Sequence, residues 1–300
     1  MSGEFGVEVW APAKLTLSLR ITGVRPDGYH LIESEMFSVD LFDTLIVSPG
    51  DRLTVDTGDG PLGRARSVGW PTRSIPTGPD NLVRRALSAT GREAAVHLVK
   101  RIPPGAGLGG GSADAAAVLR WAGRTDLDLA AGLGADVPFC LHGGRAMVRG
   151  IGERLEPLPH LDRSFVLLLL PFGVDTAAVY RAWDDLVDQG RLPPPWPPEG
   201  AGGTRPGPAG PAADGGTARS AMPVNDLAAP ALIVEPRLGP WRSVFGEATG
   251  YQPRMAGSGS TFFVEGTPDS CGLGDRRTLT LGGETGLLVP VRATPAVLLR

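Results

Sequence analysis

The sequence is poor in cysteine, in long apolar runs and in excess charge of either sign. It holds two cysteines, Cys140 and Cys271, in 300 residues. These are too few for a disulfide framework or a cysteine-rich metal cluster, so we expect a reducing, cytoplasmic setting. The longest apolar run, residues 165–170, has six residues, whereas a membrane-spanning helix needs about 20. The formal net charge of −3 lacks the basic excess of nucleic-acid-binding proteins, so neither a membrane nor a nucleic-acid partner is expected.

The length and composition predict two domains. A chain of 300 residues exceeds one comfortable hydrophobic core. We therefore expect an N-terminal domain over residues 1–157 and a C-terminal domain over residues 158–300. The second contains residues 190–223, a stretch rich in proline and glycine. Such a stretch cannot bury enough apolar surface to order itself, and we expect a disordered insertion.

The strongest local signal is a glycine-rich stretch, residues 103–117, between a predicted strand and a predicted helix. Its glycines are Gly105, Gly107, Gly109, Gly110 and Gly111. Without Cβ atoms, they let backbone N–H groups approach an anion closely. The alanine-rich residues that follow favour a helix starting at Ser112, and residues 94–100 before the glycines favour a strand. Free N–H groups and the positive end of a helix dipole coincide there, which predicts a phosphate site.

Three familiar kinds of glycine-rich segment fit this stretch less well. A flexible linker would not be framed by a strand and an alanine helix. A Walker A loop is excluded because no Gly-Lys-Ser/Thr follows the glycines. The dinucleotide fingerprint needs three spaced glycines and an acidic residue after a second strand, and it does not match either.

Elsewhere the patterns are weaker. Residues 15–21 alternate apolar with polar side chains and predict one half-buried strand. Residues 58–79, rich in glycine, proline and arginine, predict a long surface loop, after which Asp80 is the expected cap of a helix. Residues 165–170 favour a strand and residues 176–183 a helix.

Three separated segments together resemble one family. Residues 12–15, 103–113 and 257–260 resemble, in order and spacing, the three motifs of the GHMP kinase superfamily. Residues 27–30 and 134–139 are similar to the branch that phosphorylates 4-diphosphocytidyl-2-C-methyl-D-erythritol, here abbreviated CDP-methylerythritol. Any one segment alone would be a weak signal, whereas their combination is specific.

The resemblance implies a fold and a reaction. The fold is α+β with two domains, an N-terminal α/β domain built like a protein of the small ribosomal subunit and a C-terminal ferredoxin-like domain, with the active site between them. The reaction is phosphorylation of the substrate's 2-hydroxyl by ATP with Mg²⁺. The implied partners are therefore ATP and CDP-methylerythritol, bound by a cytoplasmic monomer or homodimer.

The resemblance also implies roles for particular residues. Lys14 and Asp136 match the catalytic pair, in which the carboxylate orients the hydroxyl and accepts its proton late while the lysine stabilises the incipient alkoxide. Tyr29, His30 and Thr16 fall at substrate-binding positions. The residues implied to bind ATP are Asn81, Leu82, Pro103, Pro104, Gly105, Ala106, Gly107, Leu108, Gly109, Gly110, Gly111, Ser112 and Ala113. Hydroxyls of Ser112, and of Ser258 or Ser260, are candidates to reach phosphate or Mg²⁺.

This chain departs from the family pattern in three places. Thr16 stands where the family usually has Asn, which predicts a weaker polar contact near the substrate. Only 23 residues separate Ser112 from Asp136, which predicts a trimmed helical connection. The insertion 190–223 is also atypical. None of these departures removes a catalytic group.

Several alternatives stay open from the sequence. Lys14 could be a solvated strand-end residue, Asp136 a helix cap and Tyr29 a core residue. Cys140 and His142 are too few ligands for zinc and are expected to be structural. At the level of function, the alternatives are another small-alcohol kinase of the mevalonate or homoserine type, or a catalytically silent ATP-binding regulator.

Overall fold

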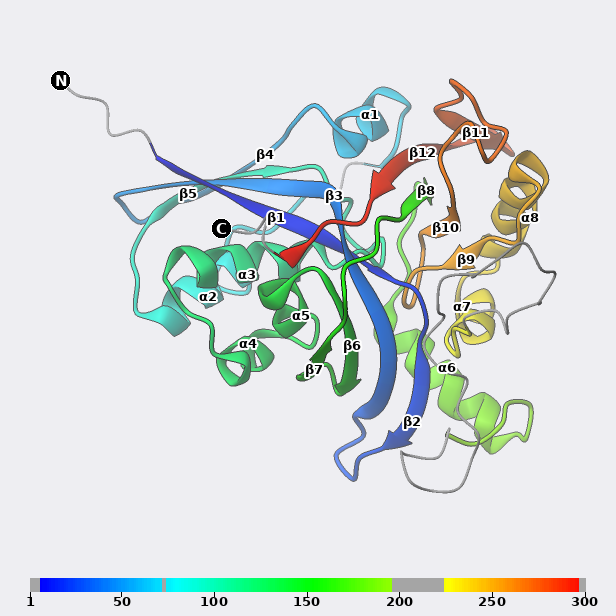
Figure 1. Cartoon of the computed structure of the whole chain (residues 1–300), viewed down its shortest axis with the longest axis horizontal. Coiled ribbons are helices and arrows are strands. Elements are labelled where there is room, and N and C mark those ends of the chain that lie inside the picture. Colours follow the sequence, from blue (N-terminus) through cyan, green and yellow to red (C-terminus); the bar gives the residue numbers. More distant parts are fainter. Residues whose placement is uncertain (1–5, 72–73, 196–223, 297–300) are drawn as a thin grey trace.

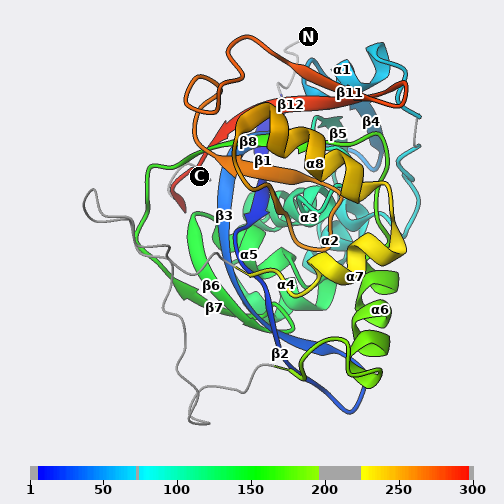
Figure 2. The same cartoon turned by 90° about the vertical axis from the view of Figure 1, so that its right-hand side faces the viewer.

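The structure is a computed structural model that describes residues 6–71, 74–195 and 224–296. Two β-sheets with helices packed on them form the α+β architecture that the resemblance implied (Figures 1 and 2). Residues 196–223, most of the predicted insertion, lie outside the described residues. Among the helices that are described, none is both long and apolar enough to cross a bilayer.

The first sheet is built around one long strand, β3. Seven strands lie in the order β4-β5-β3-β6-β7, and β1 and β2 also pair with β3. They are β1 (Val7–Thr16), β2 (Arg20–Val24), β3 (His30–Ser48), β4 (Leu53–Thr57), β5 (Ala95–Lys100), β6 (Arg145–Gly150) and β7 (Arg154–Pro157). Because β3 runs for 19 residues, its C-terminal part pairs with β5 and its N-terminal part with β6.

Helices cover one face of this sheet (Figure 1). They are α2 (Leu82–Thr90), α3 (Gly110–Trp121), α4 (Leu127–Leu133) and α5 (Val137–His142). The central helix is α3, which contacts β1, α2, α4 and α5. Its residues 113–119 are all buried, and four of them are alanines, whose small side chains let the surrounding elements approach closely.

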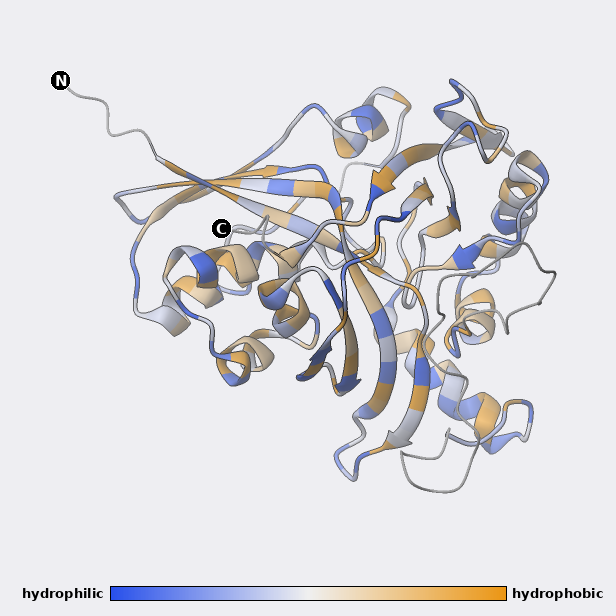
Figure 3. Ribbon diagram, in the orientation of Figure 1, coloured by the Kyte–Doolittle hydropathy of each residue, from blue (hydrophilic) through white to orange (hydrophobic). Residues whose placement is uncertain are grey.

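The second sheet packs on the first through aromatic residues. Its order is β11-β12-β8-β10-β9. The strands are β8 (Ser164–Leu169), β9 (Arg254–Met255), β10 (Phe262–Glu265), β11 (Thr278–Leu281) and β12 (Glu284–Arg292), and the helices α6 (Thr176–Asp188), α7 (Ala228–Val234) and α8 (Leu238–Thr249). Figure 3 shows β3 banded in hydrophobic and hydrophilic residues, and its middle part is buried on both faces. On the face toward the second sheet, the Phe37 ring lies 6.1 Å from that of Phe165 in β8, and Phe165 lies 6.0 Å from Phe263.

Several local predictions are confirmed and two are wrong. The strand at 165–170 and the helix from 176 are β8 and α6. The single strand expected over 15–21 is instead the end of β1 and the start of β2. Between them the ladder with β3 is irregular: the Leu17 N–H donates to the Glu35 carbonyl at 2.8 Å, whereas the Leu19 N–H donates to the Val224 carbonyl at 2.9 Å. The loop expected over 58–79 contains a short helix, α1 (Pro61–Ser67), which starts with the fixed φ of Pro61.

Candidate active site

The glycine-rich loop joins β5 to α3, as the sequence predicted. The helix begins at Gly110 rather than at Ser112, because Gly109 takes the left-handed N-cap conformation with a φ of 67°. Glycine adopts this backbone without strain, whereas serine would not. Ser112 therefore lies within the first helical turn, and it lines the cavity described below.

A second loop, residues 256–260, closes over the glycine-rich loop. A Cβ atom on Gly107, whose φ is 77°, would lie 2.5 Å from the Ala256 carbonyl oxygen and 2.6 Å from that of Gly259. The Thr261 N–H donates to the Ala106 carbonyl at 3.3 Å. Only glycine fits at position 107, since two backbone segments meet there.

Both loops border one cavity of about 540 Å³. It brings together most of the residues that the resemblance assigned to ATP and catalysis. The members from that set are Lys14, Asn81, Leu82, Pro103, Pro104, Gly105, Ala106, Gly107, Leu108, Gly109, Gly110, Gly111, Ser112, Asp136 and Ser258. Residues near the two ends of the chain therefore meet at one place. A cleft of this size has room for a nucleotide and a second substrate.

Lys14 and Asp136 face each other in this cavity. Their Nζ and Oδ2 atoms lie 3.4 Å apart, with 7% of the Lys14 side chain and 34% of the Asp136 side chain exposed. The Lys14 ammonium also donates to Thr16 Oγ1 at 3.1 Å. Lys14 is therefore not a solvated strand-end residue. Asp136 precedes α5 but makes no side-chain capping bond, so its carboxylate is available to a ligand.

The two loops also hold the Lys14 side chain in place. A Cβ atom on Gly109 would lie 2.8 Å from Lys14 Cγ, and one on Gly257 would lie 3.3 Å from Lys14 Nζ. The lysine stem therefore passes between two glycines that leave room for it. A buried, confined ammonium beside a half-exposed carboxylate can orient a hydroxyl and offset negative charge developing on it.

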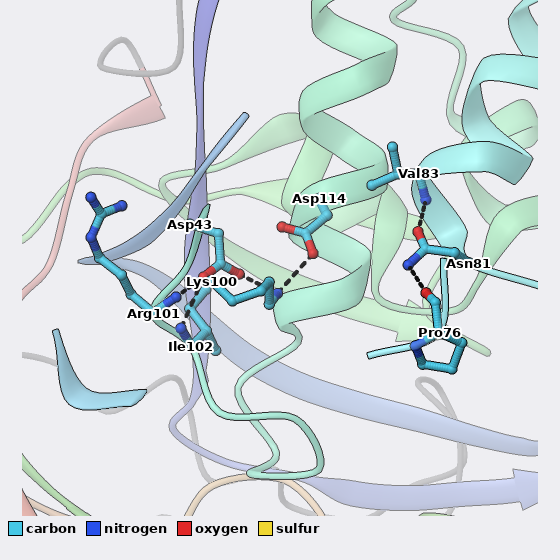
Figure 4. Close-up of polar contacts among 8 residues, drawn as sticks. All are labelled: Asp43, Pro76, Asn81, Val83, Lys100, Arg101, Ile102 and Asp114. Carbon is cyan, nitrogen blue, oxygen red and sulfur yellow. Dashed lines mark hydrogen bonds and ion pairs between the residues drawn. The ribbon is translucent and has the colours of Figure 1, made fainter. Parts of the chain in front are cut away.

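A buried ion cluster under the phosphate loop was missed by the sequence analysis. Lys100 donates from Nζ to Asp43, and to Asp114 Oδ2 at 2.7 Å (Figure 4). Asp43 Oδ1 also accepts from the N–H groups of Arg101 and Ile102, at 2.5 and 2.9 Å. The cluster thus ties β3, the end of β5 and the second turn of α3 together. No local motif marks it, because Asp43 reaches Lys100 only through the pairing of β3 with β5.

Burial dominates the chemistry of this cluster. The side chains of Asp43, Lys100 and Asp114 are 0%, 4% and 5% exposed. Desolvation raises the pKa of Asp114 from its ordinary value near 4 to about 7, against the attraction of Lys100. A second carboxylate, Asp43, adds to the rise. Near neutral pH, one lysine therefore faces two carboxyl groups of which one readily binds a proton.

Asn81, and not Asp80 as predicted from the sequence, caps the helix that follows. It is the N-cap of α2, where its Oδ1 accepts from the Val83 N–H at 2.8 Å. Its Nδ2 donates to the Pro76 carbonyl at 2.7 Å (Figure 4). Asn81 and Leu82 line the cavity. With its amide engaged at both ends, Asn81 fixes the wall of the cavity on this side.

The residues expected to bind the substrate differ in burial and in their contacts. Thr16 is buried beside Lys14. Tyr29 is 59% exposed, which excludes a core role, and the Arg25 guanidinium lies over its ring, 5.8 Å from the centroid. The His30 ring packs instead on Tyr180 of α6, with centroids 4.7 Å apart. Tyr180 lines the cavity, and sequence reasoning missed it within the predicted helix. Burial raises the pKa of its phenol, which therefore stays neutral.

Comparisons with known proteins agree with this geometry. A family model described as GHMP kinases N terminal domain matches residues 81–144, a range that includes the glycine loop and Asp136. The 4-diphosphocytidyl-2-C-methyl-D-erythritol kinase of Ruegeria pomeroyi is 38% identical over 273 residues, 86% of this chain and 88% of the relative. The kinase of that name from Paracoccus denitrificans is 40% identical over 84% of each chain. This chain belongs to the 4-diphosphocytidyl-2-C-methyl-D-erythritol kinase family.

Solved structures give the same assignment for the fold. A crystal structure of a 4-(cytidine 5'-diphospho)-2C-methyl-D-erythritol kinase matches with a TM-score of 0.62 and 29% identity, over 96% of this chain and all of the other. The mevalonate kinase of Methanococcus jannaschii matches with a TM-score of 0.53 at 11% identity. That second likeness shows a common fold and nothing finer. Family membership therefore favours the first of the functions considered from the sequence.

The two serines of the second loop that were considered for phosphate or Mg²⁺ differ in their surroundings in this chain. Ser258 lines the cavity and its hydroxyl lies 2.8 Å from that of Thr176. Ser260 is fully buried and donates to the Phe172 carbonyl at 2.6 Å, so it is committed to the loop. Asn225 also holds this loop, since its Nδ2 donates to the carbonyls of Met255 and Gly257 at 3.0 and 2.7 Å.

The fit of Mg²⁺ can be judged from the donors present. Across the described ranges, no group of three or more His, Cys, Asp or Glu residues could hold a metal ion. Mg²⁺ often keeps several waters and is held by substrate phosphates with one or two protein oxygens. The Ser112 hydroxyl lines the cavity in the first turn of α3 and makes no hydrogen bond to another described residue. These donors fit a metal that arrives with the nucleotide. Cys140 is buried in the core, as expected of a structural residue.

Proposed function

We propose that this chain transfers the γ-phosphoryl group of ATP to the 2-hydroxyl of CDP-methylerythritol, a step of non-mevalonate isoprenoid precursor biosynthesis. The observation that carries the proposal is the Lys14–Asp136 pair, 3.4 Å apart in the cavity that the glycine-rich loop borders. Family membership supports CDP-methylerythritol as the substrate, and the residues of the cavity support phosphoryl transfer as the reaction. Two buried free cysteines, Cys140 and Cys271, are compatible with a cytoplasmic enzyme.

In the proposed reaction, the oxygen of the 2-hydroxyl attacks the γ-phosphorus. A new O–P bond forms, the bond between the γ-phosphorus and the β,γ-bridging oxygen breaks, and ADP leaves. Asp136 orients the hydroxyl and accepts its proton as the bond forms, and the proton then passes to solvent. Lys14 offsets the charge that develops on the attacking oxygen, as a confined ammonium in a cleft can do.

The rest of the cavity would hold the nucleotide. Backbone N–H groups of residues 105–111 and the N-terminal end of α3 offer donors and a positive dipole to the phosphates. Ser112 would hold Mg²⁺, which offsets phosphate charge when bound. Asn81 and Leu82 are proposed to contact adenine. Tyr29, His30 and Thr16 are proposed to contact the CDP-methylerythritol.

Some finer expectations remain predictions. The division into domains at residue 157 lies between β7 and β8, where a connection between the two sheets supports it. The monomeric or homodimeric state and the absence of a nucleic-acid partner also stay predictions. The kinases of the alternative substrates, mevalonate and homoserine, share only the fold with this chain.

The proposal is tested with a panel of acceptor alcohols. Purified protein is incubated with ATP and CDP-methylerythritol, mevalonate or homoserine, and ADP release is coupled to an optical signal. We expect turnover only with CDP-methylerythritol, and phosphorus NMR of the product then locates the new phosphate. Phosphorylation of another alcohol instead, or ATP binding with no product at saturating substrate, would contradict the proposal.

A substitution tests the catalytic pair itself. Asp136→Asn keeps the size of the side chain but removes the proton acceptor, so we expect kcat to fall by roughly 100-fold or more. Affinity for ATP should stay nearly unchanged, since the glycine loop is untouched, and this is measured by titration calorimetry. The matched control is Asp188→Asn at an exposed position at the end of α6. Unchanged turnover in Asp136→Asn would remove Asp136 from its role.

A further inference from the structure

The short segment 224–227, which leads into α7, is bonded to the first sheet beside β2. The Leu19 N–H donates to the Val224 carbonyl, and the Asp226 N–H donates to the Leu19 carbonyl, both at 2.9 Å. Between these two bonds, Asn225 pairs with Leu19 as an isolated parallel bridge. The backbone of Asn225 is therefore fixed to the first sheet, whereas its side chain bonds to the second loop and the residue before it.

The side-chain amide of Asn225 has backbone partners for both of its hydrogens and for its oxygen. Nδ2 donates to the carbonyls of Met255 and Gly257 at 3.0 and 2.7 Å, and Oδ1 accepts from the Leu227 N–H at 3.0 Å. Carbonyls only accept and N–H groups only donate, so these partners fix which way the amide points. An aspartate would have the same size, but it would turn an oxygen toward two carbonyl oxygens.

Gly257 is where the second loop meets Lys14. A Cβ atom on Gly257 would lie 3.3 Å from Lys14 Nζ, 3.6 Å from Thr16 Oγ1 and 3.7 Å from the Gly107 carbonyl oxygen. Among the described residues, only Asn225 donates to the Gly257 carbonyl. The space left for the lysine ammonium therefore depends on the Asn225 amide.

We propose that Asn225 is a positioning residue for Lys14, because its amide holds Gly257 where the second loop confines the lysine ammonium beside Asp136. The inference rests on the proposed function, since it takes Lys14 as the cation that offsets charge on the attacking oxygen. Gly257 is one of the described residues that line the cavity, and Asn225 is not. Asn225 thus acts through the loop rather than by touching a substrate.

Two substitutions at position 225 test the kinetic effect. Asn225→Asp replaces both amide donors by a carboxylate that the two carbonyls repel, and we expect kcat to fall by about 100-fold, as a displacement of about 1 Å does. Asn225→Ala removes the donors without the repulsion, and we expect a fall of about tenfold. KM for ATP should change by less than about threefold in both variants, because the Thr261 N–H still donates to the Ala106 carbonyl and joins the two loops.

Lysine labelling follows the position of Lys14 without using activity. The chain has only the lysines Lys14 and Lys100, and Lys100 is held by Asp43 and Asp114 instead of the second loop. Lys100 is therefore an internal reference for reductive methylation of the folded protein. We expect the ratio of Lys14 to Lys100 labelling to rise by about tenfold in Asn225→Asp, because the loop opens locally and exposes the Lys14 ammonium.

The matched control is Asp226→Asn in the same segment. Asp226 Oδ2 accepts from the Ile21 N–H at 2.8 Å, and an asparagine keeps an acceptor for that group. Both kcat and the labelling ratio should therefore stay at their wild-type values.

Each outcome has a separate meaning. If wild type phosphorylates no acceptor alcohol, the proposed function fails, and the labelling ratio still tests whether Asn225 positions Lys14. An unchanged ratio in Asn225→Asp overturns the inference. Equal acceleration at both lysines overturns it too, because it indicates a general loosening of the fold. Wild-type kcat in Asn225→Asp and Asn225→Ala would show that the loop keeps Lys14 in place without the amide.

Discussion

At the scale of single residues, Gly107 shows why the phosphate loop tolerates no side chain at its centre. Its left-handed backbone alone would cost an alanine about 1 kcal/mol. In addition, the new Cβ would lie 2.5 Å from the Ala256 carbonyl oxygen. Backbone atoms cannot move aside as a flexible side chain can, so the loop at 256–260 and the glycine-rich loop would have to separate.

We therefore expect Gly107→Ala to weaken ATP binding as well as folding. The matched control is Gly69→Ala, because Gly69 has a similar φ of 80° and no atom within 4 Å of its added Cβ. In denaturant titrations, Gly69→Ala should lose about 1 kcal/mol of free energy of unfolding from its left-handed backbone, and Gly107→Ala should lose more because of the close approach. Only Gly107→Ala should lose roughly tenfold or more in ATP affinity, and equal affinities in the two variants would show that the close approach does not matter.

At the scale of secondary-structure elements, the sequence predicted those helices, strands and loops that depend on neighbouring residues. The strand, glycine loop and alanine helix from residue 94 to 121 could be predicted from the sequence, because each depends on neighbouring residues. The helix start was misplaced by two residues, since the left-handed cap at Gly109 competes with Ser112. The break between β1 and β2 could not be predicted, because Leu19 bonds to Val224 far along the chain.

The same distinction applies to the candidate site. Lys14 and Asp136 were found only because motifs around them resemble a known superfamily. Asp43 lies in an ordinary strand pattern, and its importance appears only when β3 pairs with β5. Tyr180 lies inside a predicted helix whose pattern does not reveal that one face borders a cleft.

The Asp43–Lys100–Asp114 cluster predicts a pH dependence of stability that belongs to the elements it joins. The folded-state pKa of Asp114 is raised to about 7, above its value in the unfolded chain. The folded state therefore binds the Asp114 proton more tightly, and this contribution to stability is lost as the pH rises from about 4 to 7. Asp114→Asn removes the titration while keeping an acceptor for Lys100.

We expect the melting temperature of Asp114→Asn to fall less than that of wild type between pH 4 and pH 7. The comparison is made by calorimetry at several pH values in one ionic strength. Asp59→Asn, a change on the exposed side of the β4–α1 connection, is the control and should follow the wild-type curve. Parallel curves for wild type and Asp114→Asn would show that Asp114 does not titrate in this range.

On the scale of the whole molecule, lysine and arginine occupy different places: the lysines are buried and the arginines supply the positive charge of the described surface. The chain has 29 lysines and arginines, of which only Lys14 and Lys100 are lysines. Both are buried and both line the cavity, whereas the described surface carries its positive charge as arginine. A compact ammonium suits a confined site where one charge must face a carboxylate, and arginine's larger fork would not fit between Gly109 and Gly257.

This distribution predicts that modification of lysine side chains reports on the cavity, apart from the reaction of the chain's α-amino group. Reductive methylation under native conditions should modify Lys14 slowly, because 7% of its side chain is exposed, and Lys100 more slowly still at 4%. A non-hydrolysable ATP analogue with Mg²⁺, at about 100 times its Kd, should reduce Lys14 modification by up to about 100-fold, since only the free protein reacts. Peptide mass spectrometry resolves the two sites, and denatured protein gives the fully reactive reference. Fast labelling of Lys14 that the analogue leaves unchanged would mean that the nucleotide binds elsewhere, because a triphosphate gripped by the glycine-rich loop has to cover the ammonium beside it.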